Sequence, residues 1–118
     1  PDRDHRSRRL VVTAWHPANA AFSNLPPCHF TWVLNVQGGK LNTHLTQRSG
    51  DIALGVPFNI AAYSLVTHVI ARQTDFEVGE FSHTVVDSHI YCGEGDRGEW
   101  YGDNIEELRR RVREAGSK

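Results

Sequence analysis

Cys28 is the first side chain in this sequence that could act as a nucleophile. It follows Pro26 and Pro27 at the start of a strand-like segment, so a rigid loop presents it. Addition of a thiolate to a substrate splits one difficult step into easier ones. The alternative is a Cys that packs as a small buried hydrophobic residue, the commoner fate of a lone Cys. His29 forms no dyad with it by adjacency, because neighbours on a strand point to opposite faces.

The segment Gln47-Arg48-Ser49-Gly50-Asp51 gathers an amide, a guanidinium, a hydroxyl and a carboxylate at a strand end. Arg48 and Ser49 could bind a phosphate, since a guanidinium offers a bidentate fork. An Arg48–Asp51 ion pair that closes a turn explains the same pattern. Both interpretations stay open on the residues alone.

Arg8 and Arg9 form a second possible anion site. Adjacent side chains on a strand diverge, so one Arg can bind an anion while the other braces it. The alternative is a basic, solubilising chain end.

The seven histidines raise the question of a metal site. His83, His89 and Cys92 are the closest set, but their spacing matches no compact zinc pattern and leaves a fourth ligand unassigned. We therefore expect no metal. The sequence also contains no Walker loop, no dinucleotide-binding fingerprint and no Gly-x-Ser-x-Gly elbow.

Alternating residues predict the strands that position these side chains. Residues 28–36 and 40–48 both alternate, and Gln37-Gly38-Gly39 joins them, which predicts a hairpin. We expect Ser49-Gly50-Asp51 to break the second strand. Further strands are expected over residues 10–15 and 80–91, with a loop over residues 16–27. One face of the second strand is predicted to carry Leu41, Thr43, Leu45 and Gln47.

Two helices are predicted. Pro57 suits a first helical turn, and the apolar residues that follow at helical spacing are Phe58, Ala61, Ala62, Leu65, Val66, Val69 and Ile70. Asp103-x-x-Glu106 resembles a capping box that opens a last helix. The basic end of that helix, Arg109 to Arg113, is expected to be a solvated face, with a nucleic-acid patch as the alternative.

Composition excludes several classes of protein. The 118 residues carry a net charge of −1, which argues against a dominant polyanion-binding surface. No apolar run approaches the roughly 20 residues of a membrane helix. Two Cys make no disulfide scaffold, and reduced thiols in the cytoplasm are the simpler expectation. The chain lacks Met and begins Pro1-Asp2, so we expect a piece of a longer protein.

Five motifs, in order and at matching spacings, resemble thymidylate synthase over about residues 6–91. The motifs are Leu25-Pro26-Pro27-Cys28-His29, Gly39-Lys40-Leu41, Gln47-Arg48-Ser49-x-Asp51, Leu54-Gly55-Val56-Pro57-Phe58-Asn59-Ile60-Ala61 and Asp87-Ser88-His89-Ile90-Tyr91. The resemblance implies an α/β (α+β) fold, a curved mixed sheet with a long buried helix, truncated here. It implies a single partial catalytic domain over residues 1–118, with residues 92–118 as a divergent extension ending in a helix.

The resemblance implies reductive methylation of dUMP to dTMP, with 5,10-methylenetetrahydrofolate as co-substrate and no metal. Cys28 is then the nucleophile that adds to C6 of the uracil. Asp51 would meet the pterin of the folate, and Asn59 would recognise the uracil edge. The other substrate-binding residues implied by the matched motifs are Gln47, Arg48, Ser49, Gly50, His89, Ile90 and Tyr91. Arg8 and Arg9 match an arginine pair that reaches the partner's phosphate across a homodimer interface.

The sequence departs from the family at several places. Thr46 and Val33 stand where the family usually has Tyr and Gln. The family's N-terminal portion, with a folate-binding Trp, a proton-handling Glu and a Tyr near C5, has no counterpart here, and its closing C-terminal segment is also missing. Two alternatives therefore remain, a pyrimidine nucleotide hydroxymethylase of the same fold and a truncated, non-catalytic nucleotide-binding fragment.

Overall fold

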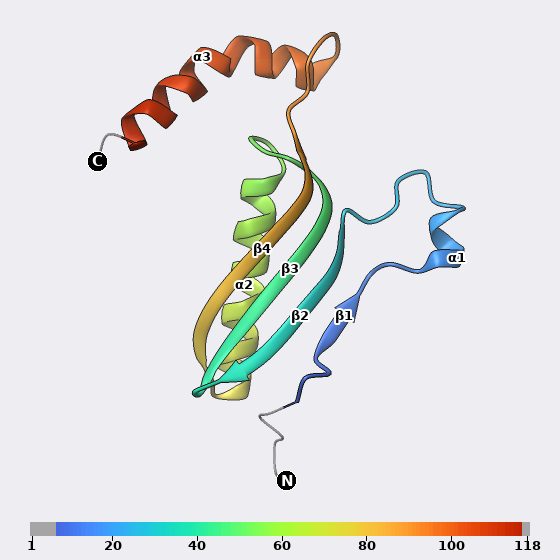
Figure 1. Cartoon of the computed structure of the whole chain (residues 1–118), viewed down its shortest axis with the longest axis vertical. Coiled ribbons are helices and arrows are strands. Elements are labelled where there is room, and N and C mark those ends of the chain that lie inside the picture. The colour runs from blue at the N-terminus through green and yellow to red at the C-terminus, as the bar shows by residue number, and fades with distance from the viewer. Residues whose placement is uncertain (1–6, 117–118) are drawn as a thin grey trace. The chain divides into compact units, whose positions relative to one another are not determined.

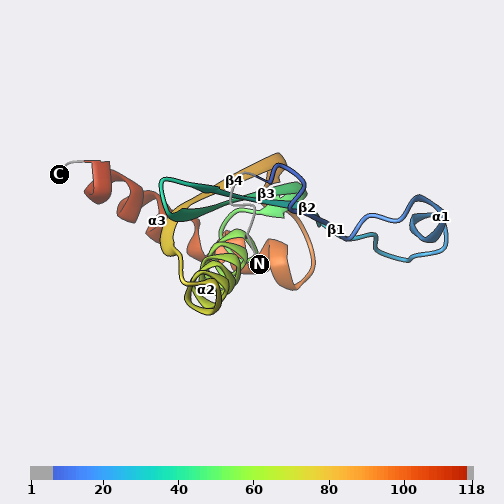
Figure 2. The same ribbon diagram turned by 90° about the horizontal axis from the view of Figure 1, so that it is seen from below.

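The computed structural model describes residues 7–116, and its chain forms two compact units, Pro1–Ser88 and His89–Lys118. Each unit is described by itself. The first holds a mixed sheet of four strands in the order β1-β2-β3-β4, with the long helix α2 along one face (Figures 1 and 2). The predicted α/β class with a mixed sheet is confirmed.

The predicted hairpin is confirmed as β2 (His29–Gln37) and β3 (Lys40–Asp51). The strands are antiparallel and close on Gln37 opposite Lys40. Gly38 and Gly39 make the two-residue turn at φ of 58° and 78°, a backbone conformation that suits hairpin turns and favours glycine. Side-chain alternation then buries Leu41, Thr43, Leu45 and Gln47 on one face of β3, as predicted.

The expected break at residues 49–51 is wrong, because β3 continues to Asp51. The reason lies outside the segment. The backbone N–H of Arg48 donates to the carbonyl of Cys28, the residue before β2. Gly50 packs between Val56 and Val85, which come from the helix and the strand that follow. These neighbours hold Ser49-Gly50-Asp51 in the extended conformation, although its composition alone suggests a turn.

β1 (Val11–Thr13) pairs antiparallel with β2, with Val11 opposite Val33. The segment that connects β1 to β2 along the chain, which the sequence predicts to be a loop, contains a single helical turn, α1 (Pro17–Ala20). Its N-cap is His16, whose Nδ1 accepts a hydrogen bond from the backbone N–H of Asn19 at 3.3 Å.

α2 (Val56–Thr74) starts where predicted, with Pro57 in its first turn, and stops at Asp75 in the left-handed conformation. It leads to β4 (Glu77–His89), which runs in the same direction as β3 beside it (Figure 1). The helix packs on the sheet through a narrow face in which Thr67 and Ala71 are buried. The hydroxyls of Thr43 and Thr67 share a hydrogen bond of 2.9 Å at this junction.

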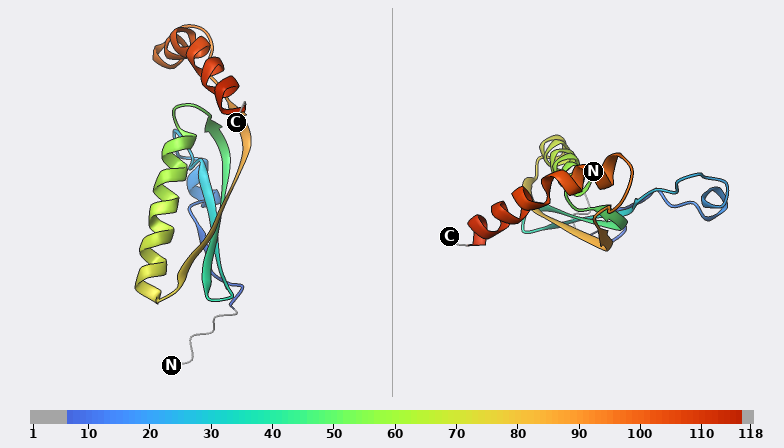
Figure 3. Two further views of the ribbon diagram at one scale, coloured as in Figure 1. Left: turned by 90° about the vertical axis from the view of Figure 1, so that its left-hand side faces the viewer. Right: turned by 90° about the horizontal axis from the view of Figure 1, so that it is seen from above.

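The apolar residues predicted to line α2 lie largely on its other side. Phe58 is 76% exposed and Leu65 is 65% exposed. The helix predicted to be long and buried is therefore covered on one face only within the described residues (Figure 3).

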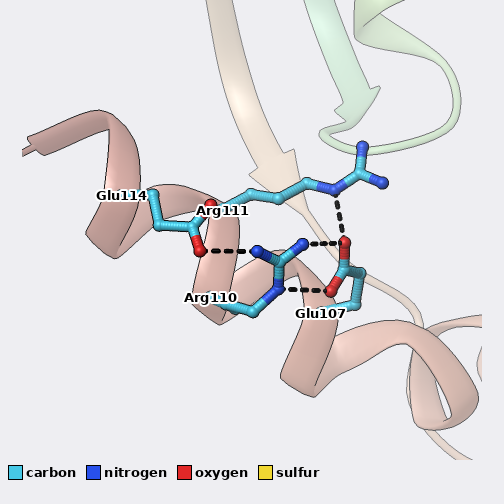
Figure 4. A network of polar contacts seen from close by, with 4 residues as sticks. All are labelled: Glu107, Arg110, Arg111 and Glu114. Carbon is cyan, nitrogen blue, oxygen red and sulfur yellow. Dashed lines mark hydrogen bonds and ion pairs between the residues drawn. The ribbon is translucent and has the colours of Figure 1, made fainter.

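The second unit contains α3 (Asp96–Gly116). The prediction that Asp103 opens this helix is wrong, because the helix begins at Asp96. The same Asp-x-x-Glu spacing occurs there with Glu99, and acidic residues in a first turn suit the helix dipole. Farther along α3, Arg110 donates to Glu107 at 2.7 Å and to Glu114 at 2.5 Å, while Arg111 donates to Glu107 at 2.8 Å (Figure 4). The arginines thus form ion pairs on a solvated face.

Candidate functional site

Cys28 and Arg48 are joined where β2 and β3 pair. The backbone N–H of Arg48 donates to the Cys28 carbonyl at 2.9 Å. The Arg48 guanidinium donates through Nε to the Pro27 carbonyl at 3.1 Å and through Nη2 to the Pro26 carbonyl at 2.6 Å. Among the described residues, the guanidinium is bonded to these carbonyls and not to the Asp51 carboxylate. The Arg48–Asp51 ion pair that the sequence offered as an alternative is therefore not formed. Cys28 is half-buried and its thiol is free.

An amide network lies beside this pair. Gln47 is 3% exposed, and its Nε2 donates to the Ser49 carbonyl at 2.8 Å and to Asn59 Oδ1 at 3.1 Å. Asn59, on the first turn of α2, shares a 3.2 Å hydrogen bond with Nε2 of His29 through its Nδ2. Both polar atoms of the Asn59 side chain are thus held by the sheet and are not used to cap the helix.

The network extends at both ends. Nδ1 of His29 lies 3.4 Å from the Tyr63 hydroxyl, and the two rings meet edge to face with centroids 5.6 Å apart. At the other end Nε2 of His83, on β4, lies 3.0 Å from Gln47 Oε1. Burial, with the nearby charges of His29 and His44, lowers the pKa of His83 below its usual 6.5.

The remaining residues of the 47–51 motif have different surroundings. Gly50 is buried, and a Cβ there would lie 2.8 Å from Val56 Cγ2, so this position admits only glycine without a shift. Asp51 is 7% exposed and its Oδ1 accepts from the Leu54 N–H at 3.2 Å, which shapes the turn into α2. Ser49 is half-buried and contributes its carbonyl to the amide network.

An open hollow of about 480 Å³ lies next to Arg48. Its wall is mostly apolar and includes Trp15 and Phe30, whose rings meet edge to face with centroids 6.3 Å apart. Thr13, Pro17 and Thr31 complete it. Of the described residues on this wall, Arg48 is the one that carries a charge, so an anion that enters the hollow would meet its guanidinium.

Arg8 and Arg9 lie far from Cys28 in their own chain. The Leu10 carbonyl accepts from the Leu34 N–H at 2.9 Å, which places this arginine pair near the hairpin end of β2. Cys28 precedes the opposite end of the same strand. At the rise of a β-strand, the separation is about 20 Å. Both arginines are exposed.

His89, Ile90 and Tyr91 belong to the second unit. The His89 and Tyr91 rings meet edge to face with centroids 5.1 Å apart, and the Arg97 guanidinium lies 5.0 Å from the centre of the Tyr91 ring. Ile90 is exposed. These contacts make one cluster of the two aromatic side chains and a cation.

Among residues 7–116, no group of three or more His, Cys, Asp or Glu side chains is placed to hold a metal ion. In the same range, no helix is both long enough and apolar enough to cross a membrane.

Sequence reasoning missed His29, Tyr63 and His83 as members of the site. The sequence presents His29 as the neighbour of Cys28 and as the last residue of the first family motif, with no sign of its contact to α2. The bulge between His29 and Thr31 in β2 allows both His29 and Trp32 to contact Tyr63. Tyr63 lies one helical turn after Asn59, a spacing that places both on one face of α2. No local signal connects His83 to Gln47, 36 residues away.

Comparisons with known proteins agree on one family. A family model described as thymidylate synthase matches residues 2–115. A curated protein named thymidylate synthase, from Haloferax volcanii, is 62% identical over 116 residues, which cover 98% of this chain and 34% of that protein. The chain thus spans about a third of the length of the curated relative it matches. The family match continues past Tyr91, farther than the five motifs alone.

Proposed function

The chain belongs to the thymidylate synthase family, and we propose that it supplies the nucleotide half of a site that converts dUMP to dTMP. The supporting observation is the contact between motifs far apart in sequence. Asn59 is bonded to Gln47, which precedes Arg48, and to His29, which follows Cys28. The backbone segments that carry Cys28, Arg48 and Asn59 are therefore neighbours in the first unit, which supports the proposal.

In this proposal the Cys28 thiolate adds to C6 of the uracil. The C5–C6 double-bond pair moves onto C5, where the O4 carbonyl delocalises it. C5 would then attack the methylene carbon of the folate and lose its proton to a base. The bond from that carbon to the folate nitrogen would break, which leaves an exocyclic methylene on C5. This methylene would take up the hydride as the Cys28 thiolate leaves C6. The protein's contribution is a covalent bond that makes C5 nucleophilic. The Arg48 guanidinium is bonded to the carbonyls of Pro26 and Pro27, the two residues before Cys28.

Polar residues would place the nucleotide. Arg48 and Ser49 suit the phosphate, because a guanidinium and a hydroxyl both donate to phosphate oxygens. Asn59 and Gln47 suit the uracil edge. His89 and Tyr91 would hold the ribose 3′-hydroxyl, with Ile90 between them.

5,10-Methylenetetrahydrofolate would supply the one-carbon unit and the hydride, leaving as dihydrofolate. Asp51 fits the pterin of this co-substrate in chemical type. Its carboxylate is an acceptor at the end of β3, with Oδ1 already ordered by the Leu54 N–H, and a pterin ring presents N–H donors.

A homodimer is part of the proposal, because Arg8 and Arg9 lie about 20 Å along the sheet from their own Cys28. They would reach the phosphate of the partner's site. Mixing a Cys28→Ser protein with an Arg8→Glu/Arg9→Glu protein tests this. Neither is expected to be active alone, and the mixed dimer is expected to recover activity in the one site that combines an intact Cys28 with the partner's arginines. No recovery after subunit exchange would contradict donation across the interface.

The activity is tested with the full-length protein and dUMP labelled with tritium at C5. Methylation releases tritium and yields dTMP. Tritium release with a 5-hydroxymethyl product would identify the hydroxymethylase alternative instead. The isolated 118-residue chain is expected to release little tritium, because positioned acid–base groups contribute about 10²–10⁴-fold and the family carries them in its N-terminal portion. Normal turnover by the isolated chain would contradict this expectation.

A further inference from the structure

The side chains of Gln47 and Asn59 are the central links of a series of hydrogen bonds that joins three strands and one helix. In this hydrogen-bond chain each link has a donor and an acceptor. It runs from His83 on β4 through Gln47 on β3 and Asn59 on α2 to His29 on β2. Tyr63, one turn farther along α2, completes it. Such chains have a direction, because each amide and each neutral imidazole has one end that donates and one that accepts.

A backbone carbonyl sets the direction of this chain. The Ser49 carbonyl can only accept, so the atom of Gln47 that lies 2.8 Å from it is the NH2 group. The second N–H of that group points to Asn59, which must present its oxygen. Oε1 of Gln47 is then an acceptor, and His83 must carry its proton on Nε2.

The direction decides what Asn59 offers to a ligand. Its Oδ1 accepts from Gln47 and its Nδ2 donates to His29, so one lone pair and one N–H remain. Uracil presents an N3–H donor beside an O4 acceptor and pairs with that set. Cytosine presents an acceptor at N3 and a donor at N4, which opposes it.

We propose that His83 is a positioning residue that holds Gln47, and through it Asn59, in the orientation that selects uracil over cytosine. This inference rests on the proposed function. Gln47 is 3% exposed, and His83 is the donor that faces its Oε1 in the described part of the chain. Without this donor a buried acceptor is left unsatisfied and one of the three bonds that orient the amide is lost.

The surroundings of His83 support the assignment. Burial and the neighbouring His29 and His44 disfavour its charged form, which lowers its pKa. This shift favours the neutral ring, in which one nitrogen donates and the other accepts. In this neutral ring the proton must lie on Nε2. Gln47 turns its NH2 group to the Ser49 carbonyl, so its Oε1 faces His83 and needs a donor there.

The test compares kcat and KM for dUMP and dCMP in three full-length variants. His83→Phe is expected to lower kcat/KM for dUMP roughly tenfold, mainly through KM, and to reduce the dUMP-to-dCMP preference by a similar factor. His83→Gln, whose amide N–H can replace Nε2–H, is expected to restore most of both. His68→Phe is the matched control, because His68 is an exposed residue of α2 and takes no part in the hydrogen bonds that join His83, Gln47, Asn59 and His29. Both values should stay unchanged.

An unchanged preference in an active His83→Phe enzyme would overturn the inference while leaving the proposed function intact. Failure of the wild-type protein to methylate dUMP would instead remove the proposed function. A second measurement does not depend on any variant folding. The ¹⁵N shifts of the His83 ring in the wild-type protein should show the proton on Nε2, and a proton on Nδ1 alone would overturn the inference.

Discussion

The backbone N–H of Arg48 donates to the Cys28 carbonyl at 2.9 Å, and the guanidinium of the same residue bonds the two carbonyls before Cys28. Arg48 therefore holds the Pro26–Cys28 loop in two ways, through its own main chain and through its own side chain. This double attachment connects the end of β3 with the segment that leads into β2 and carries Cys28. It also means that a change at Arg48 acts on the Pro26–Cys28 loop as well as on any bound phosphate.

Arg48→Lys should weaken the fold and the binding of dUMP together. A lysine has no planar fork, so it cannot make the Nε and Nη2 bonds at once. We expect the free energy of unfolding to fall by about 1–2 kcal/mol, measured by urea titration, and the Kd for dUMP to rise in calorimetry. Arg72→Lys, in the exposed last turn of α2, is the control. A variant with unaltered stability would show that these carbonyl bonds contribute nothing to the fold.

Cys28→Ser should abolish turnover. A hydroxyl is a much poorer nucleophile than a thiolate toward C6, and loss of a covalent nucleophile typically costs a thousandfold or more, on the order of 10³–10⁶. Tritium release from C5-labelled dUMP measures this in the full-length protein. Cys92→Ser is the matched control, since Cys92 is the other free thiol and is exposed in the second unit. Equal loss in both variants would argue against a special role for Cys28.

Asn59→Asp should shift the preference from dUMP toward dCMP. A protonated carboxyl can pair with the N3 and N4 atoms of cytosine, whereas each mismatched polar group costs roughly 1–3 kcal/mol. The ratio of kcat/KM for the two nucleotides, before and after the change, measures the effect. Asn24→Asp, in the exposed segment before Pro26, provides the same chemical change away from the network. An unaltered ratio would remove Asn59 from the specificity argument.

Gly39→Val should destabilise the hairpin. Gly39 has a φ of 78°, and nothing lies within 4 Å of the Cβ it would gain, so the cost arises from the backbone alone. A β-branched residue in this conformation costs about 1–2 kcal/mol. Urea unfolding measures it, with Gly38→Asn as the milder comparison, since Asn tolerates the left-handed region. Equal stability of the Val variant and the wild type would mean that the turn rearranges.

Glu107 should titrate far below other glutamates. Hydrogen bonds from Arg110 and Arg111 lower its pKa from 4.5 to about 2. Because the folded pKa is depressed, the stabilisation of α3 is present above pH 4.5 and is lost as the pH falls from 4.5 toward 2. The ¹³C shift of the Glu107 carboxyl across this window measures the pKa. Arg110→Gln should raise the midpoint, and a wild-type midpoint near 4.5 would contradict the ion-pair geometry of Figure 4.

Local patterns determined much of the first unit from the sequence alone. The hairpin followed from two alternating strands around Gly38-Gly39, and the start of α2 followed from Pro57. These features depend on residues within one turn or one strand of each other, so short-range rules capture them. The family motifs also identify Cys28, Arg48 and Asn59 as candidate site residues from the sequence alone.

Tertiary packing decided the rest. Ser49-Gly50-Asp51 is extended because Val56 and Val85 pack against Gly50, although its composition favours a turn. Thr67 and Ala71 lie on the side of α2 that meets the sheet, although larger apolar residues lie on the other sides of the helix. His83 reaches Gln47 only because the β3-α2-β4 connection returns the chain beside β3. In each case a residue's environment comes from an element distant in sequence, and hydrophobicity, turn propensity and spacing contain no information about that neighbour.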